Sequence, residues 1–266
     1  MTTAATSPDA TRHRLLEGVL LRLAKLPGAE GFVLRGGMLL RHWLRPTPRP
    51  AGDLDLVATF PFDVAAAARR FLPVFAAAAD DGVAFDSDRL HVEGIWLDTG
   101  TPGVRVFAAG EVGGVEEDFH VDITFGPFPR PAPVFGAIPT ACGETARVWV
   151  CRPEAVVGQK VQALRHLGML GWRAKDLNDL RLLLNRVPME TAALRVSITA
   201  YLADLGRRLT DALEMFAPSS WWGMKLCLAR WLDFVNASPG RAVPRDLAGV
   251  IAGIADRLAP VLEELP

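Results

Sequence analysis

Two aspartates separated by one residue, Asp53 and Asp55, are the first candidates for chemistry in this sequence. The segment from Asp53 to Val57 alternates polar and apolar residues, which predicts a strand with both carboxylates on one face. Asp122 lies in a second alternating segment, His120 to Phe125, and adds a third carboxylate to a polar strand face. Three carboxylates brought together repel one another unless cations neutralise them. The pattern therefore predicts a metal site, with two Mg²⁺ ions expected.

The spacing D-x-D is weak evidence alone, because Asp86 and Asp88 have it too. The segment before Asp53 distinguishes the first pair. An apolar strand at 32–34, the pair Gly36-Gly37 and a helical pattern at 38–44 precede Asp53 in that order. Glycines at such a turn let the backbone approach a triphosphate, although a plain turn uses the same residues. Two metal ions on carboxylates can clamp the attacking and leaving oxygens of an in-line phosphoryl displacement. Together these features predict nucleotidyl transfer from an NTP.

A second set of charged residues lies in the later, helical part of the chain. Lys160 stands on one predicted helix, and the next helix begins with Arg173, Lys175, Asp176 and Asp179. Only four of the 29 basic residues are lysines, so two lysines in this set are informative. Asp176 and Asp179 share a helix face, and Lys175 and Asp179 have the spacing of an ion pair. We expect Lys160 to neutralise triphosphate charge with Asp176 orienting it; ordinary ion pairs on a solvated face are the alternative.

The hydrophobic pattern divides the chain into two parts with different secondary structure. Short strands and helices alternate up to about residue 150, and only helical patterns follow, which predicts domains at 1–150 and 151–266. We expect the helical domain to complete an NTP-binding cleft. Proline-rich connections are expected at 46–50 and 126–139. The expected strands are 32–34, 53–57, 90–97, 104–108, 120–125 and 146–150, and the expected helices are about 13–26, 38–44, 63–79, 153–170, 174–184, 189–216, 219–235 and 244–265.

The composition excludes several classes of protein. Half of the residues are hydrophobic and 22% are charged, which is typical of a folded protein and excludes a disordered chain. The net charge of -1 excludes a generally basic nucleic-acid-binding protein, so a polyanion must meet a local patch. Three cysteines without C-x-x-C spacing indicate a reducing compartment. Neither a signal peptide nor an apolar run of the roughly 18 residues that span a membrane is present, so we expect a soluble cytoplasmic protein.

These motifs resemble those of the AbiEii-type nucleotidyltransferase toxins, a branch of the polymerase-β-like nucleotidyltransferase superfamily. The segments 32–37 and 53–56 are similar to the first motif of that family, and Val121-Asp122-Ile123 is similar to its next carboxylate strand. The segments 154–164 and 173–180 resemble its later lysine and R-x-K-D-x-x-D-L motifs. The resemblance covers about residues 30–185, and the C-terminal part is matched only in being helical.

The resemblance implies an α+β fold, with a polymerase-β-like mixed sheet followed by an all-helical C-terminal domain. It also implies a Mg²⁺-dependent enzyme that moves a nucleotide from an NTP to an acceptor. Some members modify the 3′ end of tRNA, and members are commonly toxins paired with an antitoxin.

The same resemblance assigns roles to individual residues. Asp53 and Asp55 become metal ligands, and Asp122 is a candidate third ligand. Lys160 contacts the triphosphate, and Asp176 is a required polar residue near it. The residues expected to bind the NTP are Gly36, Gly37, Lys160, Arg173, Lys175 and Asp179.

Two other functions are compatible with the same residues. One is a small-molecule nucleotidyltransferase of the aminoglycoside-modifying type, which labelling of a drug in place of RNA would indicate. The other is a catalytically silent fold kept as a partner-binding module. The intact D-x-D pair and Lys160 argue against the silent fold, and absence of NTP binding with Mg²⁺ would argue for it.

Overall fold

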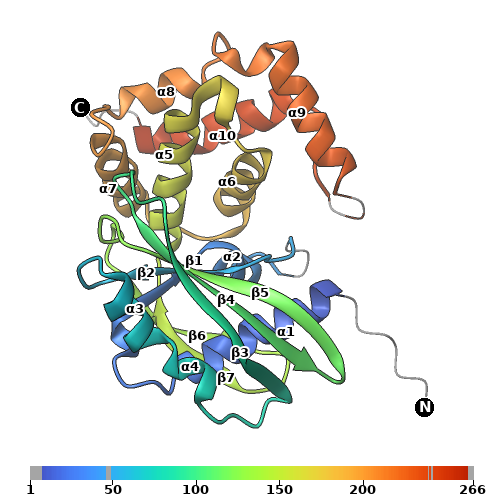
Figure 1. The fold of residues 1–266 in the computed structure, drawn as a ribbon. Coiled ribbons are helices and arrows are strands. Elements are labelled where there is room, and N and C mark those ends of the chain that lie inside the picture. Colours follow the sequence, from blue (N-terminus) through green and yellow to red (C-terminus); the bar gives the residue numbers. More distant parts are fainter. Residues whose placement is uncertain (1–7, 46–48, 239, 241, 263–266) are drawn as a thin grey trace. The chain divides into compact units, whose positions relative to one another are not determined.

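The structure is a computed structural model that describes residues 8–45, 49–238, 240 and 242–262. The chain divides into two compact units, one formed by residues 1–128 and 133–151 and the other by residues 129–132 and 152–266. Figure 1 shows the helices and strands in colours that follow the sequence. Residues 46–48 of the expected connection and residues 263–265 of the last expected helix lie outside the described residues.

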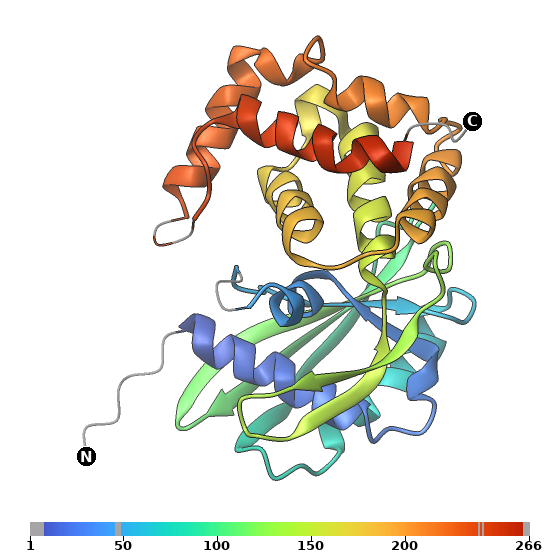
Figure 2. The ribbon, with the colours of Figure 1, turned by 180° about the vertical axis from the view of Figure 1, so that it is seen from behind.

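The first unit contains a seven-stranded mixed sheet and short helices, seen from two sides in Figures 1 and 2. Its strands are β1 (Phe32–Arg35), β2 (Leu54–Ala58), β3 (Val83–Ile95), β4 (Gly103–Val112), β5 (Val115–Thr124), β6 (Val134–Pro139) and β7 (Thr145–Val150). Its helices are α1 (Pro8–Leu23), η1 (Ala29–Gly31), α2 (Gly36–Trp43), α3 (Val64–Phe71) and α4 (Pro73–Ala76). The strand order is β3-β4-β5-β2-β1-β7-β6. The pairs β1/β7 and β2/β5 are parallel and the others antiparallel, so the sheet is mixed as expected.

Strand β5 shows which face of the sheet the helices cover. Phe119 contacts the ring of Phe75 in α4, and Glu117 forms an ion pair with Arg12 in α1. Because successive residues of a strand point to opposite faces, His120 and Asp122 lie on the other face. We call this second face, which also carries Asp118, the site face of the sheet.

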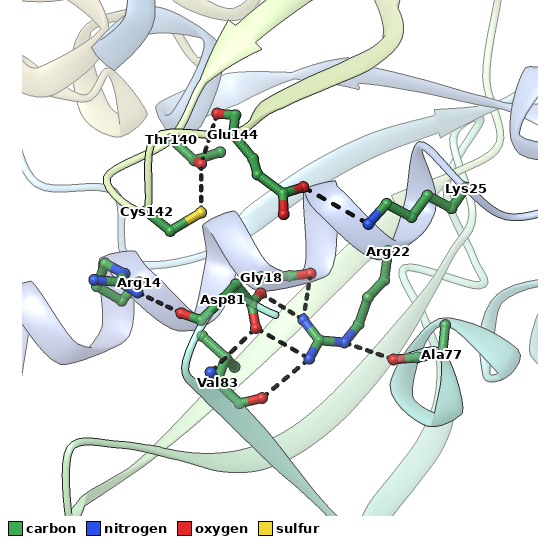
Figure 3. Close-up of polar contacts among 10 residues, drawn as sticks. All are labelled: Arg14, Gly18, Arg22, Lys25, Ala77, Asp81, Val83, Thr140, Cys142 and Glu144. Carbon is green, nitrogen blue, oxygen red and sulfur yellow. Dashed lines mark hydrogen bonds and ion pairs between the residues drawn. The ribbon is translucent and has the colours of Figure 1, made fainter. Parts of the chain in front are cut away.

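A buried ion pair fastens the connection between α4 and β3 to helix α1 (Figure 3). Arg22 Nη1 donates to Asp81 Oδ2 at 2.6 Å, and its side chain is 5% exposed. The other N–H groups of Arg22 donate to the second Asp81 oxygen and to the carbonyl oxygens of Gly18, Ala77 and Val83. All five N–H groups of the guanidinium therefore have acceptors, which is how a buried arginine avoids an unpaired charge.

The second unit is helical. Its elements are α5 (Pro153–Gly171), α6 (Ala174–Arg186), α7 (Thr191–Ala203), α8 (Thr210–Phe216), η2 (Trp221–Gly223), α9 (Lys225–Asn236) and α10 (Leu247–Leu262). Helices α5 and α7 cross closely at Gly158, where a Cβ atom would lie 2.5 Å from the ring of Tyr201. Trp172 and Trp222 pack edge to face at 5.0 Å, and Trp222 Nε1 donates to the Met215 carbonyl. This unit therefore has an aromatic core of its own.

Several expected element boundaries are wrong, and tertiary contacts explain them. The segment 126–139, expected to be a connection, contains β6, which gains its hydrogen bonds by pairing with β7 at the sheet edge, where proline is tolerated. The expected helix 189–216 is interrupted at Gly206, whose φ of +66° ends α7 and leaves α8 separate. The expected helix 63–79 is two helices, α3 and α4. Asp63, at which the expected helix begins, caps α3, since its Oδ1 accepts from the Ala66 amide at 2.7 Å.

Two further properties follow from the described residues. Cys142, Cys151 and Cys227 are free thiols. Within the described ranges, no helix combines the length and apolar character needed to cross a bilayer.

Candidate active site

Asp53, His120 and Asp122 form a group of potential metal ligands on the site face. One ligand atom of each lies within 4.8 Å of the others, and no second group of this kind occurs among the described residues. Asp53 directly precedes β2, whose parallel pairing with β5 sets Asp55 opposite Asp122. His120 precedes Asp122 by two residues and therefore shares its face. Its Nε2 lies 3.7 Å from Asp53 Oδ2.

The chemistry of this group fits a divalent cation. Mg²⁺ takes oxygen ligands at about 2.1 Å, so two ligands of one ion lie at most about 4.2 Å apart, a little less than the 4.8 Å within which the atoms of this group lie. The imidazole of His120 is a ligand that suits transition metals better than Mg²⁺. The group therefore fits Mg²⁺ through its carboxylates and Mn²⁺ through all three side chains.

Asp55 lies beside this group but directs its carboxylate to the first turn of α2. The Gly37 amide donates a hydrogen bond to it. Gly36, at φ +69°, leaves room for it, since a Cβ at residue 36 would lie 2.5 Å from Asp55 Cγ. Burial raises the pKa of Asp55; Asp53 and Asp122 add to the rise, while Arg35 and the Gly37 amide oppose it. The two glycines, expected to contact a triphosphate, thus contact a carboxylate of the D-x-D pair.

Asp122 is neutralised within the protein. Arg105 on β4 donates from Nε to Asp122 Oδ1 at 2.7 Å and from Nη2 to Oδ2 at 2.8 Å. Asp122 is 3% exposed, and the hydrogen bond to it is the main cause that raises the pKa of Arg105. The three carboxylates alone would repel one another strongly. The structure adds a guanidinium group that offsets part of their repulsion.

The second expected set forms a buried ion-pair cluster within the helical unit. Lys160 Nζ donates to Asp176 Oδ1 at 2.9 Å and to Asp179 Oδ2 at 3.0 Å. Arg173 Nε donates to the other oxygen of Asp176 at 2.6 Å. Burial would raise the pKa of Asp176, but attraction and hydrogen bonds from Lys160 and Arg173 outweigh it and lower that pKa. Lys175 is exposed, and Asp179 contacts Lys160 from the preceding helix.

Two residues near the first group are not among the site residues predicted from the sequence. His120 could have been found, because the spacing His120-Val121-Asp122 on an alternating strand puts both polar side chains on one face. Arg105 gave no signal, because arginine is frequent throughout this chain. Its role depends on the register that sets it opposite Asp122.

Two solved structures from H. pylori have a similar fold. One is described as a proposed nucleotidyltransferase. It has a TM-score of 0.53 and 14% identity, and the match covers 94% of this chain and 92% of that one. The other, JHP933 from Helicobacter pylori, has a TM-score of 0.52 and 14% identity, covering 94% of this chain and 90% of that one. No curated protein sequence gives a significant match.

The sequence also matches, over residues 18–248, the model of the family described as "Nucleotidyl transferase AbiEii toxin, Type IV TA system". The chain belongs to this family. Membership makes it a nucleotidyltransferase and implies an NTP as substrate and an antitoxin as partner.

Proposed function

We propose that this protein transfers a nucleotide from an NTP to the 3′ end of tRNA and acts in the cytoplasm as the toxin of a toxin–antitoxin pair. The observation that carries the proposal is the group Asp53, His120 and Asp122 on the site face of a chain that belongs to the AbiEii family. The tRNA acceptor is the one implied by the family resemblance of the sequence motifs.

The reaction joins the acceptor to the α-phosphate of the NTP. The oxygen of a terminal ribose hydroxyl forms a bond to the α-phosphorus, and the bond from that phosphorus to the bridging oxygen of pyrophosphate breaks. The hydroxyl proton leaves to solvent or a base, and pyrophosphate departs. Asp53 and Asp122 would hold a divalent cation, which would supply charge stabilisation for the phosphoryl oxygens. Asp55 keeps the turn before α2 in place through Gly37 and adds negative charge beside the cation.

The helical unit has a separate task in this proposal. Lys160 uses two of its three N–H groups on Asp176 and Asp179, which leaves at most one for a triphosphate oxygen. Arg173 has a side chain that is 54% exposed, and Lys175 is exposed beside it. In this proposal Asp176 and Asp179 fix the position of Lys160, and Lys160, Arg173 and Lys175 supply cationic contacts to the NTP.

The net charge of -1 limits how such a protein can hold RNA. Without a strongly basic surface, attraction must come from local arginines and bound metal, so we expect weak, salt-sensitive tRNA binding. Tight binding to tRNA in high salt without metal would contradict this part of the proposal.

Transfer can be tested by incubating the purified protein with Mg²⁺, each labelled NTP in turn and total tRNA. We expect label at the tRNA 3′ end, and a loss of about 100-fold or more in Asp53→Asn. Asp118→Asn is the matched control, because Asp118 is an exposed carboxylate on the site face of β5 and pairs with Arg89. Labelling that survives Asp53→Asn would refute the assignment.

The same assay separates the two alternatives. Label on an aminoglycoside and none on tRNA would indicate a small-molecule nucleotidyltransferase. Absence of NTP binding by calorimetry with Mg²⁺ would indicate a silent binding module. The toxin role predicts that expression of the wild type, but not of Asp53→Asn, arrests growth, and that the product of an adjacent gene restores it.

A further inference from the structure

Five charged residues lie in one row across the first five strands of the sheet. Cross-strand register places each of them opposite the next, so all five share the site face. In strand order β3-β4-β5-β2-β1 the row is Glu93, Arg105, Asp122, Asp55 and Arg35. Two carboxylates thus occupy the centre of the row, and one arginine flanks them on each side.

The two arginines interact with the carboxylates of this row in different ways. Arg105 donates hydrogen bonds to both oxygens of Asp122, at 2.7 and 2.8 Å. This bidentate geometry gives arginine–carboxylate pairs their strength. Arg35 attracts the carboxylate of Asp55. An arginine keeps its charge at every physiological pH, so these two positive charges are permanent.

The charge of the row together with Asp53 matches one divalent cation. With all four carboxylates ionised, Asp53, Asp55, Asp122 and Glu93 against Arg35 and Arg105 leave two net negative charges. A second divalent cation at Asp122 would have to displace the Arg105 guanidinium from a carboxylate that is 3% exposed, or share that carboxylate with it at close range. Either arrangement brings unscreened positive charges together in a partly buried site, where their repulsion is strong.

We propose that Arg105 is a permanent cation of the reaction site, and that it limits the free protein to one divalent cation, with Asp53 as the principal ligand. Arg105 acts as a positioning residue, because it holds Asp122 in place. It has this role only if the metal site of the proposed function exists. The sequence predicts two bound divalent cations and this proposal predicts one in the free protein, so the number of bound ions distinguishes them.

The test is the number of Mn²⁺ ions bound per chain, measured by electron paramagnetic resonance on the full chain without nucleotide. We expect one ion in the wild type and none in Asp53→Asn. In Arg105→Gln we expect two ions, because Asp122 is released. Arg89→Gln is the matched control: Arg89 pairs with exposed Asp118 on the same face, so its loss leaves one ion.

The outcomes distinguish this inference from the proposed function. No bound ion in the wild type contradicts the metal site and, with it, the role of Arg105. Two ions in the wild type, or one in both wild type and Arg105→Gln, contradict only the role of Arg105.

A second measurement needs no variant that must fold without Arg105. In the ¹⁵N NMR spectrum of the wild type, the Nε–H of Arg105 is expected to stay protected from exchange when Mg²⁺ is added to saturation, since Nε remains bonded to Asp122. The resonance is assigned in the wild type by triple-resonance spectra that connect the Nε–H to the backbone of Arg105. Loss of that protection on adding Mg²⁺ would show that the metal displaces Arg105 and would overturn the proposal.

Discussion

The carboxylate of Asp55 lies in the space that a side chain at Gly36 would occupy. An ideal Cβ at residue 36 overlaps Oδ2 and lies 2.5 Å from Cγ of Asp55, and the backbone there has a φ of +69°. Two independent constraints, one steric and one conformational, therefore require glycine at this position. The Gly-Gly turn is thus part of the support of the D-x-D pair, whatever else it contacts.

Gly36→Ala is expected to destabilise the first unit by at least about 2 kcal/mol and to abolish nucleotide transfer. The added Cβ strains the left-handed backbone and displaces the carboxylate of Asp55. Thermal unfolding followed by circular dichroism, together with the labelling assay, measures both effects. Gly100→Ala is the control, since nothing lies within 4 Å of its Cβ position and its φ is not positive. A Gly36→Ala protein with wild-type stability would show that the turn does not have this geometry.

Asp55→Asn is expected to raise the melting temperature by a few degrees at pH 7 in EDTA. The folded-state pKa of Asp55 is raised, first by burial, so its ionisation disfavours folding. This penalty is absent below the ordinary carboxyl pKa of about 3.9 and is complete above the raised value, so the gain should vanish near pH 3. Asparagine keeps the oxygen that accepts from Gly37.

Melting curves of both proteins between pH 3 and pH 8 test this sign. Asp118→Asn serves as the comparison, because Asp118 is exposed and we expect its replacement to change stability by less than about 0.5 kcal/mol. A melting temperature of Asp55→Asn below that of the wild type at pH 7 would contradict the prediction.

Asp176→Asn is expected to lower the free energy of unfolding by about 2 kcal/mol at pH 7, because it weakens charged hydrogen bonds to Lys160 and Arg173. The folded-state pKa of Asp176 is lowered, so its contribution is present above the unfolded pKa of about 3.9 and is lost as the pH falls toward the folded value. The difference between the two proteins should be constant from pH 7 to about pH 5 and shrink below pH 4.

Denaturant titrations at several pH values measure this difference. The control is Lys175→Ala, an exposed residue of the same helix, for which we expect a change below about 0.5 kcal/mol. A difference that grows as the pH falls from 5 to 3 would refute the assigned direction of the pKa shift.

Asp81→Ala is expected to cost about 3 kcal/mol or more, because it leaves the buried charge of Arg22 without its carboxylate. The double variant Arg22→Met/Asp81→Leu should recover much of this loss, since it removes both charges. Urea unfolding of the wild type and the two variants measures the loss and its recovery. Lys25→Ala is the control, because Lys25 and Glu144 form an exposed pair at 3.6 Å that should contribute less than about 1 kcal/mol. Equal stability of Asp81→Ala and the wild type would contradict the prediction.

Local patterns were sufficient to predict several parts of the fold. Alternation between Asp53 and Val57 predicted β2, and the glycine pair predicted the turn from β1 to α2. Asp63 predicted the beginning of α3, because capping involves only neighbouring residues. Strand β6 was missed, because its hydrogen bonds come from β7 and its own proline-rich sequence resembles a connection.

The sequence by itself determined which residue types are available for chemistry and which strand or helix carries each. The tertiary structure decided their partners. Only the parallel pairing of β2 with β5 brings Asp122 to Asp55, and only the register of β4 gives Asp122 the guanidinium of Arg105. In the other unit, helix packing brings Lys160 into ion pairs with Asp176 and Asp179. Charges act over a few ångströms in space and not along the chain, so a sequence shows the charged residues but not which of them neutralise one another.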